Sequence, residues 1–292
     1  MGGTYICLSG GEPTIVKNID EYIKIANEYG LATRINTNGW NVTKTRLEKW
    51  LKNGLDQIVL SIYGIDEKTI ENTRGSNLIY KRSIKAIDAI TELKQKYKFI
   101  FILQTVIMKE NYKEIPNILK LAIDAKADLF WPSYLEDAIN LPDVRLNKEE
   151  ILDFKKNVIP KMEQIIINEN FDKRLEKRLL SSLKKYYENE YEDYIYHKKN
   201  CGCHWIGSHF TFYPNGIIDP CPGHEYFKSK YQFKIDYDYI DEFMSIDNLE
   251  RTKKEIECFD YCKYCPQGEH RELSFVVDEF HEHSSKEDVY DL

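Results

Sequence analysis

The sequence has no run of about 18 consecutive apolar residues, the length that marks a membrane-spanning helix. Residues 1–11 also lack the basic start and apolar stretch of a secretory signal peptide. Positive charge is not in excess, since 41 Lys and Arg stand against 48 Asp and Glu, a formal net charge of −7. Nucleic-acid binding normally requires clustered basic residues. We therefore expect a cytoplasmic protein that has neither a nucleic acid nor a membrane as its partner.

Cysteine is nearly absent from the first 200 residues, in which only Cys7 occurs. Cys7 lies within a predicted strand, where a lone thiol is most simply a small apolar residue. In a reducing compartment a cluster of cysteines is more often a metal site than a disulfide framework. The sequence therefore predicts a metal site in the C-terminal stretch that holds Cys201, Cys203, Cys221, Cys258, Cys262 and Cys265.

Short apolar runs alternate with amphipathic stretches over residues 5–132, a pattern typical of parallel strands joined by crossover helices. Two of the amphipathic stretches end at Gly30 and Gly54, where a left-handed helix cap is favoured. The pattern predicts an α/β fold, but spacing alone leaves open an open doubly wound sheet or a barrel. The predicted strands cover residues 5–8, 32–36, 57–62, 99–107 and 128–131.

The remainder of the chain divides by composition. Residues 147–199 are rich in Lys and Glu and then in Tyr, and their apolar spacing predicts a helical connection. Residues 200–277 form a small Cys-rich α+β module, and residues 278–292 an acidic tail. Within the module, the Asn-Gly pair at 215–216 predicts a hairpin that brings Cys203 and Cys221 together.

A glycine loop, Gly10-Gly11-Glu12-Pro13, follows the first predicted strand. Two glycines remove Cβ atoms where backbone must approach a ligand, and they leave N–H and C=O groups free. A carboxylate beside exposed carbonyls suits an ammonium group, whereas a phosphate would require Lys or a series of N–H donors. The loop therefore predicts a site for an amino-acid-like ligand. By itself, this tetrapeptide is equally compatible with a tight turn in which the proline starts a helix.

Four motifs in order resemble the radical S-adenosylmethionine (SAM) superfamily: residues 5–13, Thr37-Asn38-Gly39, Ser61 and Arg74-Gly75. In that family the glycine loop binds the amino group of SAM, and the serine and arginine positions contact its carboxylate in many members, as suits an Arg fork. The resemblance implies a partial (β/α)6 barrel over residues 1–146, with ligands at the C-terminal strand ends. The cofactor-binding residues that it implies are Gly10, Gly11, Glu12, Pro13, Asn38, Ser61 and Arg74.

The catalytic cysteines of the family have no match before Gly10. Radical SAM enzymes bind their catalytic 4Fe-4S cluster through three cysteines, usually spaced C-x3-C-x2-C, on the loop after the first strand. We therefore expect a barrel that lacks its first βα unit, as a truncated or split product or as a remnant that keeps the ligand loop. A catalytic cluster is expected only if the missing N-terminal segment is supplied.

The C-terminal cysteines resemble the SPASM/twitch modules that are appended to many radical SAM enzymes. The resemblance implies one auxiliary 4Fe-4S cluster, bound by four thiolates with Cys201 spare. A zinc site is the alternative, because zinc also takes four thiolates at such spacings. The candidate metal ligands are Cys203, Cys221 and two of Cys258, Cys262 and Cys265.

The resemblance implies a radical SAM/SPASM-type oxidoreductase or maturase that acts on a peptide or protein, with a flavodoxin or ferredoxin as electron donor. SAM would be cleaved reductively to a 5′-deoxyadenosyl radical, which abstracts a substrate hydrogen. Two other classes stay open. One is a non-catalytic iron-sulfur remnant that binds peptide, and the other is a zinc-stabilised structural module.

Overall fold

The computed structural model describes residues 4–75, 77–134, 144–171, 210–219 and 233–234. Its contacts divide the chain into two units, residues 2–187 with 279–292 and residues 188–278 with Met1, and each is described separately below. Within the described ranges, no helix is long and apolar enough to cross a membrane.

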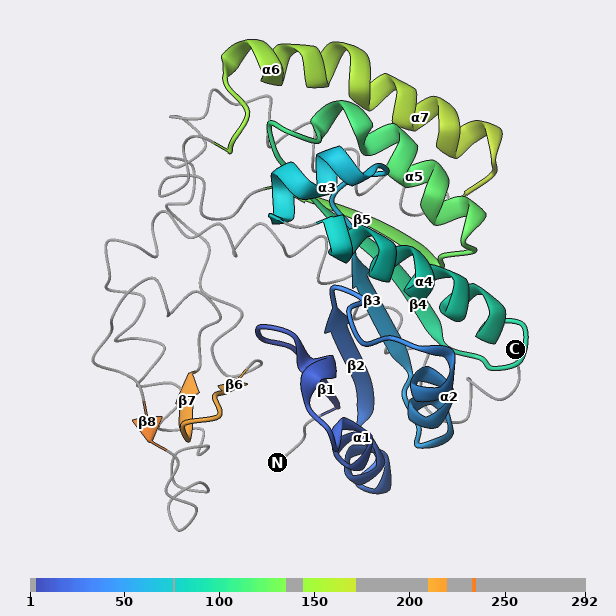
Figure 1. Ribbon diagram of the computed structural model, residues 1–292, viewed down its shortest axis with the longest axis vertical. Helices are drawn as coiled ribbons and strands as arrows, with labels where there is room; N and C mark the ends of the chain where they lie inside the picture. Colours follow the sequence, from blue (N-terminus) through green and yellow to red (C-terminus); the bar gives the residue numbers. More distant parts are fainter. Residues whose placement is uncertain (1–3, 76, 135–143, 172–209, 220–232, 235–292) are drawn as a thin grey trace. The chain divides into compact units, whose positions relative to one another are not determined.

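The first unit is built on a five-stranded sheet in which every adjacent pair of strands is parallel (Figure 1). Its strands are β1 (Tyr5–Leu8), β2 (Ala32–Thr37), β3 (Gln57–Ser61), β4 (Ile100–Ile107) and β5 (Leu129–Tyr134). The sequence therefore predicted all five strands of this sheet. Their ends differ from the prediction by no more than one residue, except that β5 continues through Pro132 to Tyr134.

The order of the strands decides between the two architectures that spacing left open. In a doubly wound sheet the strand order reverses and helices cover both faces. Here the order follows the chain from β1 to β5 without reversal, so right-handed crossovers place the connecting helices on one side. The winding is that of a partial barrel.

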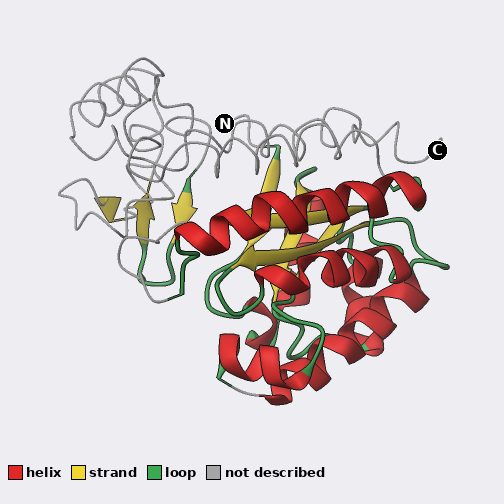
Figure 2. Cartoon of the chain, turned by 90° about the horizontal axis from the view of Figure 1, so that it is seen from above, coloured by secondary structure: helices red, strands yellow, loops and turns green. Residues whose placement is uncertain are grey.

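Four helices connect the strands and lie on the same side of the sheet in Figure 1. Figure 2 shows from above that most of the helices gather on one side of the strands. Each of these helices carries the apolar stripe that the sequence predicted. They are α1 (Ile19–Glu28), α2 (Lys44–Lys52), α4 (Asn77–Leu93) and α5 (Ile115–Asp124).

The helix-facing side of the sheet forms the apolar core. Ile35, Ile58 and Phe101 are neighbours across β2, β3 and β4, and each has 0% of its surface exposed. Leu47 and Trp50 of α2 are buried as well. Burial of each such side chain contributes about 1.5–3 kcal/mol, so this layer holds the sheet in place.

The opposite face of the sheet, called the inner face below, carries polar side chains among buried apolar ones such as Val59 and Ile102. Side chains alternate along a strand, so Arg34 and Asn36 share a face, and cross-strand register places Gln57 beside Arg34. The same register aligns Ser61 of β3 with partners on β4 and β5. The polar side chains on this face can hydrogen-bond a polar ligand. They include Arg34, Asn36, Gln57, Ser61, Gln104 and Trp131.

A short helix that the sequence did not predict, α3 (Glu67–Arg74), lies between β3 and α4. Asp66 caps it by accepting a hydrogen bond from Thr69 N at 2.9 Å. Gly75 ends it in the left-handed conformation with φ of 73°. Capping at both ends therefore defines this helix, which has only one buried apolar residue, Ile70.

Part of the predicted helical connection continues the helical layer. Helix α6 (Lys148–Asp153) starts at a capping box of Asn147 and Glu150, and a π-helical turn, η3 (Phe154–Val158), joins it to α7 (Ile159–Asn168). Helix α7 packs against α5, and the rings of Phe154 and Tyr112 meet edge to face at 6.5 Å. Residues 172–199 of the predicted connection lie outside the described residues.

The second unit contains a small antiparallel sheet of β6 (Thr211–Phe212), β7 (Ile217–Asp219) and β8 (Phe233–Lys234). The predicted hairpin is confirmed, because β6 and β7 are joined at Asn215 and Gly216. Gly216 has φ of 82°, and Asn215 Oδ1 accepts a hydrogen bond from Ile217 N at 3.1 Å. The cysteines of the predicted module lie outside the described residues.

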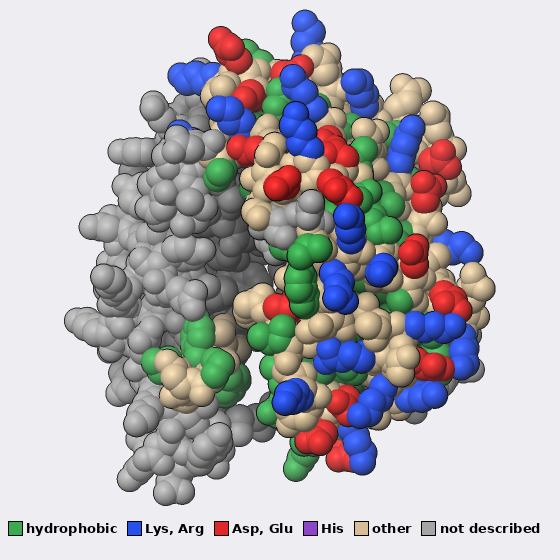
Figure 3. Space-filling model, in the orientation of Figure 1, with side chains coloured by type: hydrophobic (Ala, Val, Ile, Leu, Met, Phe, Trp, Pro, Cys, Tyr) green, Lys and Arg blue, Asp and Glu red, His purple; other side chains and the backbone are tan. Residues whose placement is uncertain are grey.

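Charges of both signs are interspersed over the described surface in Figure 3. Several form exposed ion pairs, such as Lys24 with Glu28 at 3.6 Å. Exposed pairs of this kind contribute about 0–1 kcal/mol each. On the face shown, Lys and Arg side chains lie among Asp and Glu side chains over the described residues.

Candidate functional site

The glycine loop lies at the C-terminal end of β1, immediately before a 3-10 turn, η1 (Pro13–Ile15). Gly10 has φ of 121°, which L side chains rarely adopt. A Cβ atom added to either Gly10 or Gly11 would meet no protein atom within 4 Å. The two glycines are therefore not required for packing, and they leave open backbone that a ligand can approach.

The carboxylate of Glu12 is held beside this open backbone by four hydrogen bonds. Its Oε1 accepts from Thr14 N at 3.0 Å, from Thr14 Oγ1 and from Thr37 Oγ1 at 2.6 Å. Its Oε2 accepts from Asn38 N at 2.7 Å. A carboxylate offers about four lone-pair sites, two on each oxygen. Oε2 therefore keeps an accepting direction for a further donor, such as an ammonium group.

The Thr37-Asn38-Gly39 turn after β2 supplies two of these donors. Asn38 acts through its backbone N–H, while its side-chain Oδ1 accepts from Trp40 N at 2.8 Å and shapes the turn. Gly39 has φ of 84°, and a Cβ there would lie 2.9 Å from Leu60 Cδ1. Packing at Gly39 therefore holds the Thr37-Asn38-Gly39 turn in place, and the hydrogen bonds from this turn hold the Glu12 carboxylate.

Arg46 of α2 supports the loop from the helical side. Its Nη1 donates to the carbonyl oxygens of Thr14 at 2.8 Å and Asn41 at 3.3 Å, and its Nη2 donates to that of Val16 at 3.4 Å. Its guanidinium lies over the Trp50 ring, 5.1 Å from the centroid. The sequence did not single out Arg46, because a basic residue on an amphipathic helix carries no signal of such a role.

Ser61 is the last residue of β3 and faces the polar side of the sheet, in register with Gln104 and Trp131. Arg74 is the last residue of α3. The side chain of Arg74 lies outside the described part of the chain. Its expected contact with a SAM carboxylate therefore stays a prediction.

Asn111, which follows β4, connects two segments at the edge of the sheet through its side chain. It is fully buried, and its Nδ2 donates to the carbonyl oxygens of Tyr63 at 3.1 Å and Val106 at 2.9 Å. Its Oδ1 accepts from Met108 N at 2.8 Å. One side chain thus joins the segments that follow β3 and β4, at the ligand-facing edge of the sheet.

A polar cluster that the sequence did not identify lies on the inner sheet face. Arg34 is 7% exposed, and its Nε donates to Asn36 Oδ1 at 2.9 Å. Asn36 Nδ2 in turn donates to Ser9 Oγ at 3.5 Å, next to the glycine loop. The guanidinium of Arg34 lies 5.6 Å from the ring centroid of Trp131. Burial raises the pKa of the adjacent Cys7 thiol, although the positive charge of Arg34 opposes that rise.

The glycine loop and Glu12 lie within the described residues, whereas the candidate cysteine ligands do not. The open glycine backbone and the anchored Glu12 fit the amino-acid end of SAM. All five candidate metal ligands (Cys203, Cys221, Cys258, Cys262 and Cys265) lie outside the described residues. Among residues that the structure does describe, no three His, Cys, Asp or Glu side chains gather in a way that could hold a metal ion.

Comparisons with known proteins agree with this geometry. Residues 1–122 match the model of the radical SAM superfamily. The fold is similar to that of SuiB from Streptococcus suis bound to its precursor peptide SuiA, at 18% identity and a TM-score of 0.61, covering 91% of this chain and 59% of that one. It is also similar to anSMEcpe with bound AdoMet and the Kp18Cys peptide, at 16% identity and a TM-score of 0.58, covering 91% and 75%.

At such identities the likeness to solved structures shows the fold alone, and this chain spans less than two thirds of the length of SuiB. The match to the family model bears directly on the site, because it covers β1, the glycine loop and the Thr-Asn-Gly turn that hold Glu12. Residues 1–122 thus match the radical SAM superfamily model, and the described part of this range contains β1 to β4 of the parallel sheet.

Proposed function

We propose that this chain is a radical SAM/SPASM-type iron-sulfur protein that modifies a peptide or protein substrate. The observation that carries the proposal is the anchored carboxylate of Glu12 beside the open backbone of Gly10 and Gly11. A fixed acceptor next to free carbonyl groups, at the C-terminal ends of parallel strands, suits the ammonium group of SAM.

In this proposal, different residues of the described part of the chain bind the ammonium group and the carboxylate of SAM. Glu12 Oε2 and the carbonyl groups of the glycine loop accept from the ammonium group, and Ser61 on the inner face donates to the carboxylate. Thr37 and Asn38 keep Glu12 in position before the ligand arrives. SAM would provide hydrogen-atom abstraction from the substrate if a reduced catalytic 4Fe-4S cluster is supplied beside it.

An auxiliary 4Fe-4S cluster is the second part of the proposal. Cys203, Cys221 and two of Cys258, Cys262 and Cys265 would supply four thiolates, the usual ligand set of such a cluster. The confirmed hairpin at Asn215 and Gly216 supports this arrangement, because it reverses the chain between Cys203 and Cys221. The electron donor would be a flavodoxin or ferredoxin, and the compartment the cytoplasm.

The substrate class is proposed from the neighbours in fold. SuiB was solved with the precursor peptide SuiA, and anSMEcpe with the Kp18Cys peptide. A peptide or protein is therefore the substrate that we propose for this chain.

SAM binding to the full chain, measured by isothermal titration calorimetry, tests the first part. The wild type should bind SAM, and Glu12→Gln should weaken binding at least tenfold. The NH2 group of the new amide would face N–H and O–H donors that now bond to a carboxylate oxygen of Glu12. Glu71→Gln, at an exposed position on α3, is the matched control and should leave the affinity unchanged. Equal affinities for wild type and Glu12→Gln would contradict the proposal.

Anaerobic reconstitution followed by iron, sulfide and zinc analysis tests the second part. The proposal expects iron and sulfide, and it expects iron to be lost in Cys221→Ser but kept in Cys7→Ser. Zinc without iron would instead show a zinc-stabilised structural module. With SAM and a reductant, formation of 5′-deoxyadenosine distinguishes an enzyme from a non-catalytic remnant that only binds peptide.

A further inference from the structure

Arg34 is a buried cation without an anionic partner among the residues that the structure describes. It is 7% exposed on the inner face of the sheet. Its guanidinium has five N–H donors, and the hydrogen bond to Asn36 Oδ1 occupies one of them. A charge taken out of water is costly unless it is paired, so this position calls for a counter-ion.

The neighbouring thiol of Cys7 does not supply that counter-ion. Cys7 is the cross-strand neighbour of Arg34 on β1, and burial raises the pKa of its thiol. The thiol therefore stays protonated and neutral near pH 7. Asn36 and Trp131, which also contact the guanidinium, are neutral as well.

Two further polar atoms beside Arg34 are buried and have no hydrogen-bond partner in the described part of the chain. One is the indole nitrogen Nε1 of Trp131, whose ring lies against the guanidinium, and the other is Oε1 of Gln57, the cross-strand neighbour of Arg34 on β3. Gln57 is only 2% exposed. Buried polar groups are almost always paired, so two unpaired polar atoms beside an unpaired cation indicate a binding site for a polar ligand.

We propose that Arg34, Trp131 and Gln57 form a subsite for a carboxylate group of the peptide substrate. The inference rests on the proposed function, which supplies the peptide. Arg34 and Trp131 Nε1 both donate to the carboxylate, and Gln57 Oε1 accepts from an amide N–H of the same peptide. The carboxylate is that of an acidic side chain or of the peptide's C-terminus.

The position of the subsite supports its use by the substrate. The hydrogen bonds from Arg34 to Asn36 and from Asn36 to Ser9 lead from the guanidinium to the residue before Gly10. A carboxylate held by Arg34 therefore anchors the peptide on the same face of the sheet as the loop that we propose for SAM.

Nuclear magnetic resonance of the indole N–H groups tests the subsite directly, with full-length protein labelled with 15N. Trp131→Phe identifies the Trp131 signal. N-acetyl-glutamate amide carries a side-chain carboxylate, N-acetyl-glycyl-glycine carries a C-terminal one, and N-acetyl-glutamine amide is the neutral control. The proposal expects the Trp131 signal to shift saturably with one or both acids but not with the neutral control.

Two variants separate binding from folding. Arg34→Met should weaken binding of the acid at least tenfold, while Arg34→Lys, which keeps the charge but not the planar fork, should weaken it less. A far-ultraviolet circular dichroism spectrum and a Tm close to those of the wild type confirm that each variant is folded. If Arg34→Met does not fold, Gln57→Leu provides the same test through loss of the amide contact. Unchanged affinity in the folded variants would overturn the proposal.

SAM has a carboxylate of its own, so a titration with SAM completes the experiment. The proposal expects SAM and the acidic probe to bind together without competition. Competition between them, with the Trp131 signal shifted by SAM alone, would assign Arg34 to the cofactor and overturn the assignment to the substrate. Because the acidic probes are titrated without SAM, failure of this subsite is distinguishable from failure of SAM binding.

Discussion

Thr37 and Glu12 are joined by a hydrogen bond of 2.6 Å between Thr37 Oγ1 and Glu12 Oε1, across the ends of two adjacent strands. The bond connects the turn after β2 to the loop after β1. With the hydrogen bond from Asn38 N, it orients the carboxylate through groups that belong to the rigid sheet edge. A ligand that binds Glu12 thus meets an acceptor whose direction is already set, which reduces the entropy lost on binding.

Thr37→Val should destabilise the protein and weaken SAM binding severalfold. The change keeps the shape of the buried side chain but removes its hydrogen bond to Glu12 and also the acceptor of Gly39 N at 3.0 Å. Hydrogen bonds to charged groups contribute about 1.5–3 kcal/mol. Urea unfolding followed by circular dichroism measures the loss. Thr45→Val, at an exposed position on α2, is the control and should change the free energy of unfolding by less than about 0.5 kcal/mol. Equal effects of the two changes would show that the bond to Glu12 contributes nothing.

Arg46→Met should raise the Kd for SAM several-fold, although Arg46 itself does not contact the proposed ligand site. The change removes the donors that hold the carbonyl oxygens of Thr14 and Val16, so the segment that positions Glu12 loosens. Arg46→Lys should restore part of the affinity, since it keeps one donor. Calorimetry measures both, and Lys85→Met on the exposed side of α4 is the control. A loss of stability without any change in Kd would limit Arg46 to a role in folding.

Gly39→Ala should cost more stability than Gly30→Ala, although both glycines have positive φ. An L residue in that conformation costs roughly 1–2 kcal/mol, which applies to both. At Gly39 the new Cβ would also lie 2.9 Å from Leu60 Cδ1 and 3.1 Å from Ala86 Cβ, whereas at Gly30 it meets nothing within 4 Å. Overpacking adds about 1–3 kcal/mol at Gly39 alone. Chemical unfolding of the two variants compares them, and similar losses would contradict the packing of the turn against α4.

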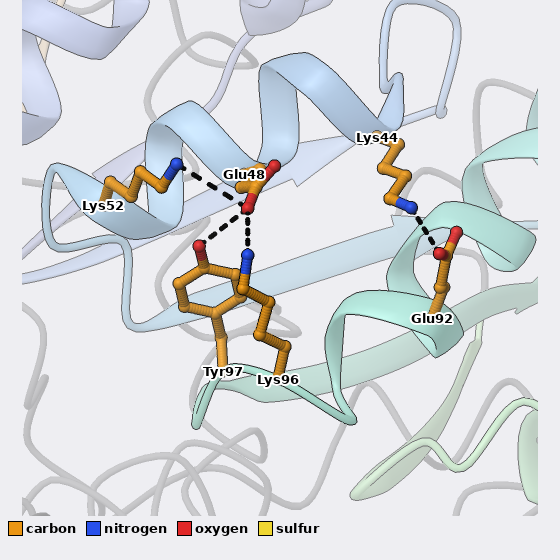
Figure 4. A network of polar contacts seen from close by, with 6 residues as sticks. All are labelled: Lys44, Glu48, Lys52, Glu92, Lys96 and Tyr97. Atoms are coloured by element: carbon orange, nitrogen blue, oxygen red, sulfur yellow. Dashed lines mark hydrogen bonds and ion pairs between the residues drawn. The ribbon is translucent and has the colours of Figure 1, made fainter.

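Glu48 should titrate far below the usual range of a glutamate (Figure 4). Hydrogen bonds from Lys96 Nζ at 2.6 Å and Tyr97 OH at 2.8 Å lower the pKa of its carboxyl from 4.5 to about 2. Since the folded-state pKa is the lower one, the stabilisation is present above pH 4.5 and is lost as the pH falls from there toward 2. The 13C signal of the Glu48 carboxyl carbon reports the midpoint.

Lys96→Met should move that midpoint up toward 4.5, because the largest cause of the lowered pKa is removed. Lys44→Met is the matched control, since Lys44 pairs with Glu92 in the same region and does not contact Glu48 (Figure 4). A wild-type midpoint near 4.5 would show that the contacts of Glu48 with Lys96 and Tyr97 in Figure 4 do not form in solution.

Apolar periodicity predicted the sheet and its main helices because those elements bury a continuous stripe or run. It did not predict α3, in which Ile70 is the single buried apolar residue and the caps Asp66 and Gly75 define the ends. It also ended β5 too early, before Pro132, since proline is normally a strand breaker. Spacing could not decide between a barrel and a doubly wound sheet, because that choice depends on which strands become neighbours.

For the site, the sequence identified the residues whose type is unusual for their position. Two glycines and an acid after a strand are conspicuous, so Gly10, Gly11 and Glu12 were found. Arg34 was not, because one charged residue in a predicted strand can face solvent equally well. Only the register with β3 and the contact with Trp131 of β5 show that Arg34 faces inward. Contacts between distant strands are the information that a single sequence does not display.

The chain-order arrangement of β1 to β5 also bears on how the protein is made. Among the described residues, each strand of this sheet pairs only with the strands before and after it in the chain. These pairings therefore need no partner from a remote part of the described sequence. Folds with local pairing form faster than those with distant pairing. The sheet can therefore assemble in the order in which the ribosome releases it, with each helix covering its strand before the next one emerges.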